Sequence, residues 1–310
     1  MGRIGDVRLN GMRSVADIMK TAWTKGTVVP GFNIPYLPMM EPVVRALRDT
    51  ECFGLISVAR LEWTKFEAKS PAAVAAEYAR VWDERYTRLH LDHVPVIDED
   101  DLRVDYLAVV GEALGLGYGS VMVDGSRLPL AENIAATRTV AEAVRAAGAA
   151  VEAELGMVLG HSDGPLPPYE ELFRTGRGFT DPAEAGRFVR ETGVDWLSVA
   201  VGSAHGAISK AHKDEKKVEA RLDIDHLKKI NAVARVPLVL HGGSGIRRNI
   251  VIEGIRNGIA KINIGTAIRQ PYERAIVTGA EAASRAVYEA TVDIIRNELE
   301  ITGSARALNP

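Results

Sequence analysis

The stretch SVMVDGSRLPLAENIAATRTVAEAVRAAGAAVEAELG, residues 120–156, decides the fold class. A short apolar run, Ser120 to Asp124, precedes a segment from Leu130 to Ala147 in which apolar residues recur with helical periodicity. A second short run, Ala150 to Glu154, follows this segment. The order strand, helix, strand is the βαβ unit of a parallel sheet.

The same alternation recurs along the whole chain, which contains eight predicted strand–helix units. Eight units in about 300 residues are typical of a (β/α)8 barrel, whereas a doubly wound sheet more often has about five to seven strands and an early glycine-rich fingerprint. No such fingerprint follows the first strand, so we predict an α/β fold of the (β/α)8 TIM-barrel class. The predicted strands are Thr27 to Ile34, Gly54 to Ala59, Arg88 to Asp92, Ser120 to Asp124, Ala150 to Glu154, Trp196 to Val201, Pro237 to Leu240 and Ala260 to Ile264. The predicted helices are Met39 to Thr50, Pro71 to Glu84, Asp100 to Leu114, Leu130 to Ala147, Asp181 to Thr192, Ile224 to Ala234, Arg247 to Asn257 and one long or broken region from Arg269 to Glu298.

Composition narrows the class of protein. With 46% hydrophobic residues in 310, the chain can bury a full core, and we expect a single domain over residues 1–310. A formal net charge of -3 gives no field that favours nucleic acid or an anionic membrane, so neither is expected as a partner. The one cysteine, Cys52, excludes an intramolecular disulfide and a thiolate metal cluster. With no apolar signal segment and no spanning segment, we expect a cytoplasmic protein.

The longest predicted segment without secondary structure runs from Gly156 to Phe179 and is rich in glycine and proline. A loop of this length in a compact barrel is often a lid or a binding loop. The alternative is a disordered surface insertion.

Three histidines end predicted strands, where side chains of a (β/α)8 barrel converge on one face. They are His93 after the third strand, His205 after the sixth and His241 after the seventh. Three imidazoles with an open fourth position are the arrangement of a catalytic zinc, whereas a structural zinc has four ligands. Any one of these histidines alone would more often be a buried or rim residue, but three at strand ends favour a metal site.

Carboxylates end three of the predicted strands. Asp92 precedes His93 and, by strand alternation, should point differently from it, as a proton-transfer group or as a partner that orients an imidazole. Asp124, with Ser126 beside it, and Glu154 end the fourth and fifth strands. These side chains are expected to bind metal transiently or to hold the ligands in place.

Glycine-rich turns after the seventh and eighth strands predict an anion site. His241-Gly-Gly-Ser-Gly-Ile246 precedes a helix and offers unhindered backbone N–H groups and the Ser244 hydroxyl. The next strand ends Asn263-Ile-Gly265-Thr266, at the place where barrel enzymes commonly bind phosphate. Each turn taken alone would be only a tight turn.

Seven ordered motifs give the chain a specific resemblance. It resembles the class II, metal-dependent ketose-bisphosphate aldolases, the family of fructose- and tagatose-bisphosphate aldolases, over nearly its whole length. The motifs are Gly31-Phe-Asn33, Leu89-His-Leu-Asp92-His93, Val121-Met-Val-Asp124-Gly-Ser126 with Glu132-Asn133-Ile134, Val151-Glu-Ala-Glu154-Leu-Gly156, Gly202-Ser-Ala-His205-Gly206, Leu240-His241-Gly-Gly-Ser-Gly245 and Lys261-Ile-Asn263-Ile-Gly-Thr266.

The resemblance implies a role for each matching residue. It makes His93, His205 and His241 the ligands of one Zn²⁺, or of another divalent metal, per chain, with Glu154 as an alternative metal-site carboxylate. It makes Asp92 the acid/base at the cleaved bond and allows for a monovalent cation. The implied phosphate and substrate contacts are Asn33, Gly206, Gly242, Ser244, Asn263, Gly265 and Thr266.

The implied reaction belongs to carbohydrate metabolism, such as glycolysis. A phosphorylated ketose is cleaved reversibly to dihydroxyacetone phosphate, or a related ketone donor, and an aldehyde. The metal polarises the ketose carbonyl while Asp92 takes a hydroxyl proton. The resemblance also implies a homodimer or homotetramer, with the helical region Arg269 to Glu298 as a candidate for the contacts.

Several positions depart from the family pattern. The loop reads Gly160-His-Ser-Asp163 where the family has acidic residues, so His161 is the candidate to replace the usual loop acid as a base. Ala59, followed by Arg60, stands where the family usually has a serine, and Val94 to Asp98 replaces glycine and small residues. These changes leave open a catalytically silent barrel that binds a phosphorylated metabolite or stabilises a partner subunit. A metal-dependent barrel hydrolase is a third hypothesis.

Overall fold

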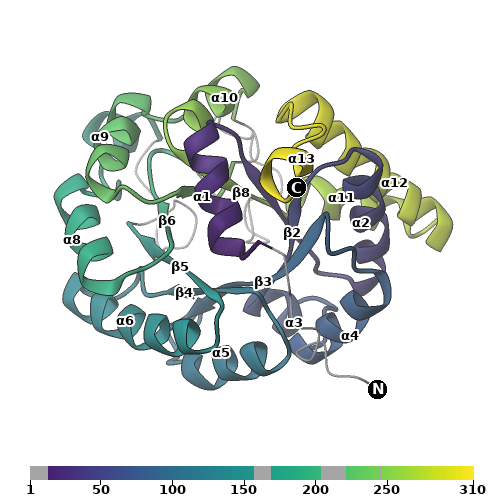
Figure 1. The fold of residues 1–310 in the computed structure, drawn as a ribbon, viewed down its shortest axis with the longest axis horizontal. Coiled ribbons are helices and arrows are strands. Elements are labelled where there is room, and N and C mark those ends of the chain that lie inside the picture. Colours follow the sequence, from purple (N-terminus) through teal and green to yellow (C-terminus); the bar gives the residue numbers. More distant parts are fainter. Residues whose placement is uncertain (1–12, 157–168, 204–220, 244–245) are drawn as a thin grey trace.

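The computed structural model describes residues 13–156, 169–203, 221–243 and 246–310. Parallel strands pair in chain order and close on themselves, β1 with β8, into a barrel surrounded by helices (Figure 1). The predicted (β/α)8 fold is confirmed. The strands are β1 Val29–Asn33, β2 Gly54–Ala59, β3 Thr87–Pro95, β4 Ser120–Asp124, β5 Ala150–Leu155, β6 Trp196–Val199, β7 Leu238–Leu240 and β8 Ile259–Ile264.

The helices of the outer ring follow the predicted positions. They are α2 Met40–Asp49, α4 Pro71–Val81, α5 Tyr106–Gly115, α6 Leu130–Ala146, α8 Pro182–Thr192, α9 Ile224–Ala234, α10 Arg248–Arg256, α11 Thr266–Ala275 and α12 Ala280–Asp293. The region predicted as one long or broken helix is broken at Gly279, which has a φ of 141° and separates α11 from α12. A π-helical turn, Ile294–Glu298, then ends α12.

The start of α5 was predicted six residues too early, at Asp100 instead of Tyr106. The Asp98 carboxylate accepts hydrogen bonds from the backbone N–H groups of Asp100 and Leu102, which holds this segment in a turn. The helix begins only after Asp105, whose side chain caps it by accepting from Ala108 N. Side-chain acceptors of this kind compete with helix formation.

Helices also lie at places where none was predicted. Short α3 (Arg60–Thr64) follows β2, and α7 (Tyr169–Thr175) lies inside the segment that was predicted to have no secondary structure. Helix α1 (Val15–Lys25) lies across one end of the barrel in Figure 1. Ser14 caps α1 by accepting from Asp17 N, and Gly26 ends it at a φ of 61°.

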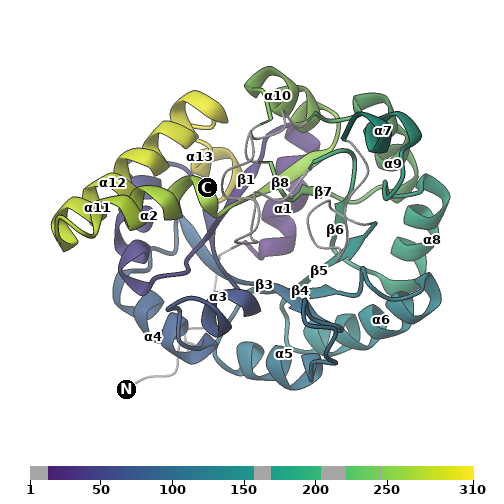
Figure 2. The same ribbon diagram turned by 180° about the vertical axis from the view of Figure 1, so that it is seen from behind.

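Helix α1 closes the amino-terminal end of the barrel. Its buried residues, among them Ile18 and Met19, pack with residues at the starts of strands, including Leu55, Ala150 and Trp196. The short C-terminal helix α13 (Ala305–Leu308) joins the same apolar cluster. The carboxyl ends of the strands therefore lie at the opposite end, which α1 and α13 leave open and which is seen in Figure 2.

Between this apolar cluster and the carboxyl ends of the strands, the inside of the barrel is polar. Strands β3, β5 and β8 are not neighbours in the sheet, so contacts between their side chains cross the barrel interior. Each of these strands contributes two inward residues, two positions apart. The lower polar layer is His90, Glu152 and Lys261, and the upper polar layer is Asp92, Glu154 and Asn263.

Among the described helices, none is long and apolar enough to cross a membrane.

Candidate active site

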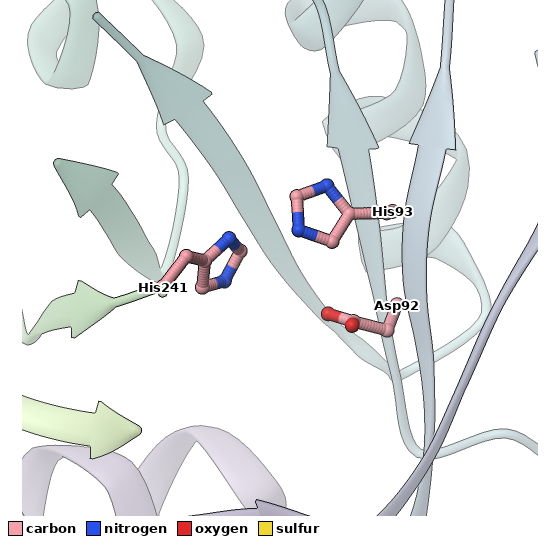
Figure 3. A group of neighbouring side chains, drawn as sticks. All are labelled: Asp92, His93 and His241. Atoms are coloured by element: carbon pink, nitrogen blue, oxygen red, sulfur yellow. The ribbon is translucent and has the colours of Figure 1, made fainter. Parts of the chain in front are cut away.

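Asp92 and His93 both point into the barrel, although they are neighbours in sequence (Figure 3). The pairing of β3 with β4 shifts between Leu91 and Val94, which leaves Asp92 and His93 in a β-bulge. His93 has a φ of 37°, in the left-handed region that side chains other than glycine rarely adopt. The expectation that strand alternation would turn the two side chains apart is therefore wrong, because the bulge re-aims one of them.

His241 faces this pair from the end of β7. The ring centroids of His93 and His241 are 4.4 Å apart. Each of Asp92, His93 and His241 offers a ligand atom, and the three atoms lie within 4.8 Å of one another. A second such group, His93, Asp124 and Glu154, shares His93 with the first. The third predicted ligand, His205, lies outside the described residues, as does His161.

Asp92 is held by two amides and one ammonium group. Asn33 Nδ2 and Asn263 Nδ2 each donate to its carboxylate at 2.9 Å, and Lys261 Nζ lies 3.7 Å from Oδ1. Burial alone raises the pKa of Asp92, but the positive charges of Lys261 and His93 outweigh burial and place this pKa well below its ordinary value. The carboxylate is therefore ionised and fixed in orientation.

Asp124 orients His93 from β4. Its Oδ2 lies 3.3 Å from His93 Nδ1, and its Oδ1 accepts from both the backbone N–H and the hydroxyl of Ser126. The structure thus brings Ser126, Asp124 and His93 into one chain of contacts. Burial lowers the pKa of His93, but Asp92, Asp124 and Glu154 raise it more, to about 10.

Two glutamates of β5 flank His241. Glu152 Oε1 lies 3.1 Å from Nε2, and Glu154 Oε2 lies 3.1 Å from Nδ1. Ser198 Oγ donates to Glu154 at 3.2 Å. Burial lowers the pKa of His241, but Glu152 and Glu154 raise it above its ordinary value. Surroundings that favour a positively charged imidazole also favour a cation, so the donor set fits a divalent metal with nitrogen and oxygen ligands.

The lower polar layer was not predicted as a functional group. Lys261 Nζ donates to Glu152 Oε2 at 2.7 Å and lies 3.2 Å from His90 Nε2. His90 Nδ1 lies 2.9 Å from Ser120 Oγ. Burial raises the pKa of Glu152, but Lys261 and His241 lower it more, to about 2. The sequence did contain a sign of this layer, because each of its members stands two residues before a member of the upper polar layer and so points to the same side of its strand.

Glu62 is a second missed carboxyl group. It caps α3, where its Oε2 accepts from Ala59 N at 2.8 Å and lies 3.5 Å from Asn33 Nδ2, which also binds Asp92. Burial raises the pKa of Glu62 to about 8. Two of the departures from the family pattern, Ala59-Arg60 and Val94 to Asp98, meet nearby, since Arg60 Nη1 lies 3.2 Å from Asp98 Oδ2.

The predicted phosphate contacts divide into described and undescribed residues. Gly265 precedes Thr266, the first residue of α11, and a Cβ on Gly265 would lie 3.6 Å from Asn33 Cβ. Asn33 and Asn263 meet at Asp92, so Asn33, Asn263, Gly265 and Thr266 lie together at the carboxyl ends of β1 and β8. Gly242 follows His241 with a φ of 66°. Gly206 and Ser244 lie outside the described residues.

The sequence matches the family model for "Fructose-bisphosphate aldolase class-II" over residues 13–306. The chain belongs to the class II fructose-bisphosphate aldolase family. It is thus an aldolase, a carbon–carbon lyase, and the resemblance drawn from the seven motifs is confirmed.

Solved structures agree on the fold of this aldolase. The crystal structure of the YdjI aldolase from Escherichia coli K12 is similar with a TM-score of 0.72 and 24% identity, over 94% of this chain and 99% of that one. Fructose-bisphosphate aldolase (Fba) from Campylobacter jejuni is similar with a TM-score of 0.70 and 17% identity, over 98% of this chain and 99% of that one. At these identities the likeness concerns the barrel itself.

Proposed function

We propose that this aldolase is zinc-dependent and reversibly cleaves a phosphorylated ketose to a ketone donor, such as dihydroxyacetone phosphate, and an aldehyde. One observation carries the proposal: ligand atoms of Asp92, His93 and His241 lie within 4.8 Å of one another at the open end of the barrel. Asn33, Asn263, Gly265 and Thr266 lie beside this group. A metal and an anion site side by side suit a phosphorylated ketone.

The metal would be held by His93, His205 and His241, with Glu154 as an alternative ligand. Nitrogen donors with an open position are the catalytic form of a zinc site, and the carboxylates of Asp124 and Glu152 would fix the imidazoles. When bound, a divalent metal supplies Lewis-acid polarisation of the ketone carbonyl.

Asp92 is proposed to take the hydroxyl proton of the ketose as the carbon–carbon bond breaks, and to return it in condensation. Its two amide partners, Asn33 and Asn263, hold the carboxylate in one orientation, which a proton acceptor needs. His161 is proposed as the acid/base for proton exchange on the three-carbon donor.

The phosphate group is proposed to bind backbone N–H groups of Gly206, Gly242 and Gly265 and the hydroxyls of Ser244 and Thr266. The first turn of α11 begins at Thr266, and the positive end of a helix favours an anion. The proposal for the whole protein is a cytoplasmic homodimer or homotetramer of single-domain chains, which light scattering would test.

The test compares metal content and cleavage in matched variants. The purified enzyme should hold about one zinc ion per chain and cleave a ketose phosphate in a chelator-sensitive way. His93→Ala and His241→Ala should lose both properties. His226→Ala is the control, because His226 Nε2 contacts the carbonyl of Thr180 instead of the metal group. Wild-type zinc content in His241→Ala would refute the site, and cleavage that resists chelators would refute the metal dependence.

A further inference from the structure

The lower polar layer replaces part of an apolar barrel core. Side chains that fill a (β/α)8 barrel are mostly branched and apolar. Here His90, Glu152 and Lys261 are fully buried at this level, and Lys261 is among the largest fully buried side chains of the described residues. A buried ion pair contributes little net stability compared with apolar residues of similar volume. The pair Glu152–Lys261 therefore needs an explanation other than stability.

The pair contacts the candidate metal group, Asp92, His93 and His241, from the side of the amino-terminal end of the barrel. Glu152 uses both carboxylate oxygens: Oε2 accepts from Lys261 Nζ at 2.7 Å and from Trp196 Nε1, and Oε1 lies 3.1 Å from His241 Nε2. Three donors on three strands, β6, the end of β7 and β8, thus converge on one carboxylate. Glu152 cannot move relative to His241 without losing the bonds to Lys261 and Trp196.

Donor and acceptor rules fix the histidine tautomers. A carboxylate accepts only, so His241 Nε2 carries the proton and donates to Glu152. An ammonium group donates only, so His90 Nε2 accepts from Lys261 and His90 Nδ1 donates to Ser120 Oγ. His241 Nδ1 lies 3.1 Å from Glu154 Oε2, the proposed alternative metal ligand, so Nδ1 is the nitrogen that faces the metal group and gives up its proton when a metal binds.

We infer that Glu152 and Lys261 are positioning residues for the metal centre: Glu152 holds the Nε2 proton of His241 so that Nδ1 is presented to the metal, and Lys261 fixes Glu152. The inference rests on the proposed metal dependence. The partner hydrogen bond of a ligating histidine sets its tautomer and orientation, and loss of such a partner weakens metal affinity about 10–100-fold.

The decisive variant is the double substitution Glu152→Gln with Lys261→Met. It replaces the ion pair by neutral side chains of similar size, and Asp92, which loses the ammonium group of Lys261, keeps the two amide donors of Asn33 and Asn263, so the barrel should fold. Zinc affinity, measured by competition with a chelator, should fall about 10–100-fold. The melting temperature of the metal-free protein is measured in parallel, because a purely structural role would change that temperature and leave zinc affinity intact.

The matched control is Ser120→Ala. It removes the partner of His90 Nδ1 and so disturbs the same layer without touching Glu152 or His241. Its zinc affinity should equal that of the wild type. A double variant that binds zinc as the wild type does, or a control that loses as much affinity as the double variant, would overturn the inference.

Nitrogen NMR of zinc-loaded wild-type protein tests the same point without a variant. The His241 ring should carry its proton on Nε2, and a proton on Nδ1 would overturn the inference even if the double variant fails to fold. The two proposals fail differently. A wild-type chain that binds no zinc refutes the metal site and the positioning role with it, whereas wild-type binding with an insensitive double variant refutes only the positioning role.

Discussion

Asp92 and His93, adjacent in β3, present a carboxylate and an imidazole to the same point inside the barrel. A regular strand would turn one of them outward. The β-bulge and the φ of 37° at His93 bring both inward, at a backbone conformation that is costly for a residue other than glycine. Strain of this kind is common at functional sites, and here it places the proposed base next to a proposed metal ligand.

Asp92→Asn should abolish most aldolase activity. The amide has the shape of the carboxylate but takes up no proton, so cleavage should fall about 10²–10⁴-fold, as for loss of a general base. Zinc content should stay at the wild-type level, because Asp92 is not among the proposed ligands. Steady-state cleavage rates and metal analysis of the same preparation check both expectations.

Asp105→Asn is the control for this substitution, because Asp105 caps α5 and asparagine is an equally good cap. It should leave the cleavage rate unchanged. An Asp92→Asn enzyme that retained wild-type turnover would assign the proton transfer to another group.

The barrel could be predicted from the sequence because short β-branched runs alternate eight times with longer segments of helical periodicity. Helix α1 was not predicted, although Ser14, Asp17 and Gly26 provide its cap signals. Helix α1 precedes the first strand, and the expected alternation of strand and helix does not include it. The bulge at His93 could not be predicted, because its cause is a backbone conformation that the residue types in this stretch do not favour.

Glu62→Gln should change how stability depends on pH. Burial raises the pKa of Glu62 from 4.5 to about 8 in the folded protein. Between these values the folded state holds a proton that the unfolded state has lost, so this group makes folding less favourable as pH rises. Glutamine does not titrate and keeps an oxygen for Ala59 N. The variant should therefore gain stability over the wild type as pH increases from about 5 to about 8.

Urea denaturation of the metal-free proteins across this pH range measures the difference. Glu67→Gln, at an exposed position of the same segment, controls for the exchange of side chain alone. A stability difference between Glu62→Gln and wild type that is constant with pH, or that shrinks as pH rises, would contradict the assignment.

Gly125→Ala should destabilise the protein and disturb Glu154. A Cβ at position 125 would lie 2.3 Å from Asn133 Oδ1 and 2.7 Å from its Cγ. Asn133 is buried, donates to the carbonyl of Glu154 at 3.0 Å and accepts from Thr137 at 3.1 Å. Displacing it leaves buried polar groups unpaired, which costs about 1–3 kcal/mol. Thermal melting measures this loss.

Gly111→Ala is the matched control, since Gly111 lies within α5 and a Cβ there meets nothing within 4 Å. Alanine in a helix should stabilise this variant by about 1 kcal/mol. If the two alanine variants melted alike, the packing of Asn133 against Gly125 would not be a stability determinant.

The candidate site was predictable where residue type and strand end coincide, as for Asp92, His93 and His241. Asp124 and Glu154 were also found this way, and both contact an imidazole of the group. Glu152 and Lys261 were overlooked because they lie below the rim, where apolar side chains are the usual filling. Glu62 was overlooked because its carboxyl group approaches the site only through the cap of α3.

Cys52 offers a probe of how the barrel opens, because it is the one thiol in the chain. Burial raises its pKa to about 12, so the thiolate that reacts with a disulfide reagent is scarce in the folded protein. The C-terminal segment covers it: Ser304 Oγ donates to Cys52 Sγ, and Ala305 N donates to the carbonyl of Glu51. Labelling should therefore require the C-terminal segment to lift or the barrel to unfold.

The urea dependence of the labelling rate separates these two openings. Lifting a short segment exposes little surface, so labelling through it should depend weakly on urea, whereas global unfolding gives a steep dependence. The segment is short, so we expect the weak dependence at low urea and a change to the steep one near the unfolding midpoint. A chain shortened to end at Thr302 should label at once and without urea dependence. Slow labelling of that shortened, folded chain would mean that β2 and α2, instead of the C-terminal segment, protect the thiol.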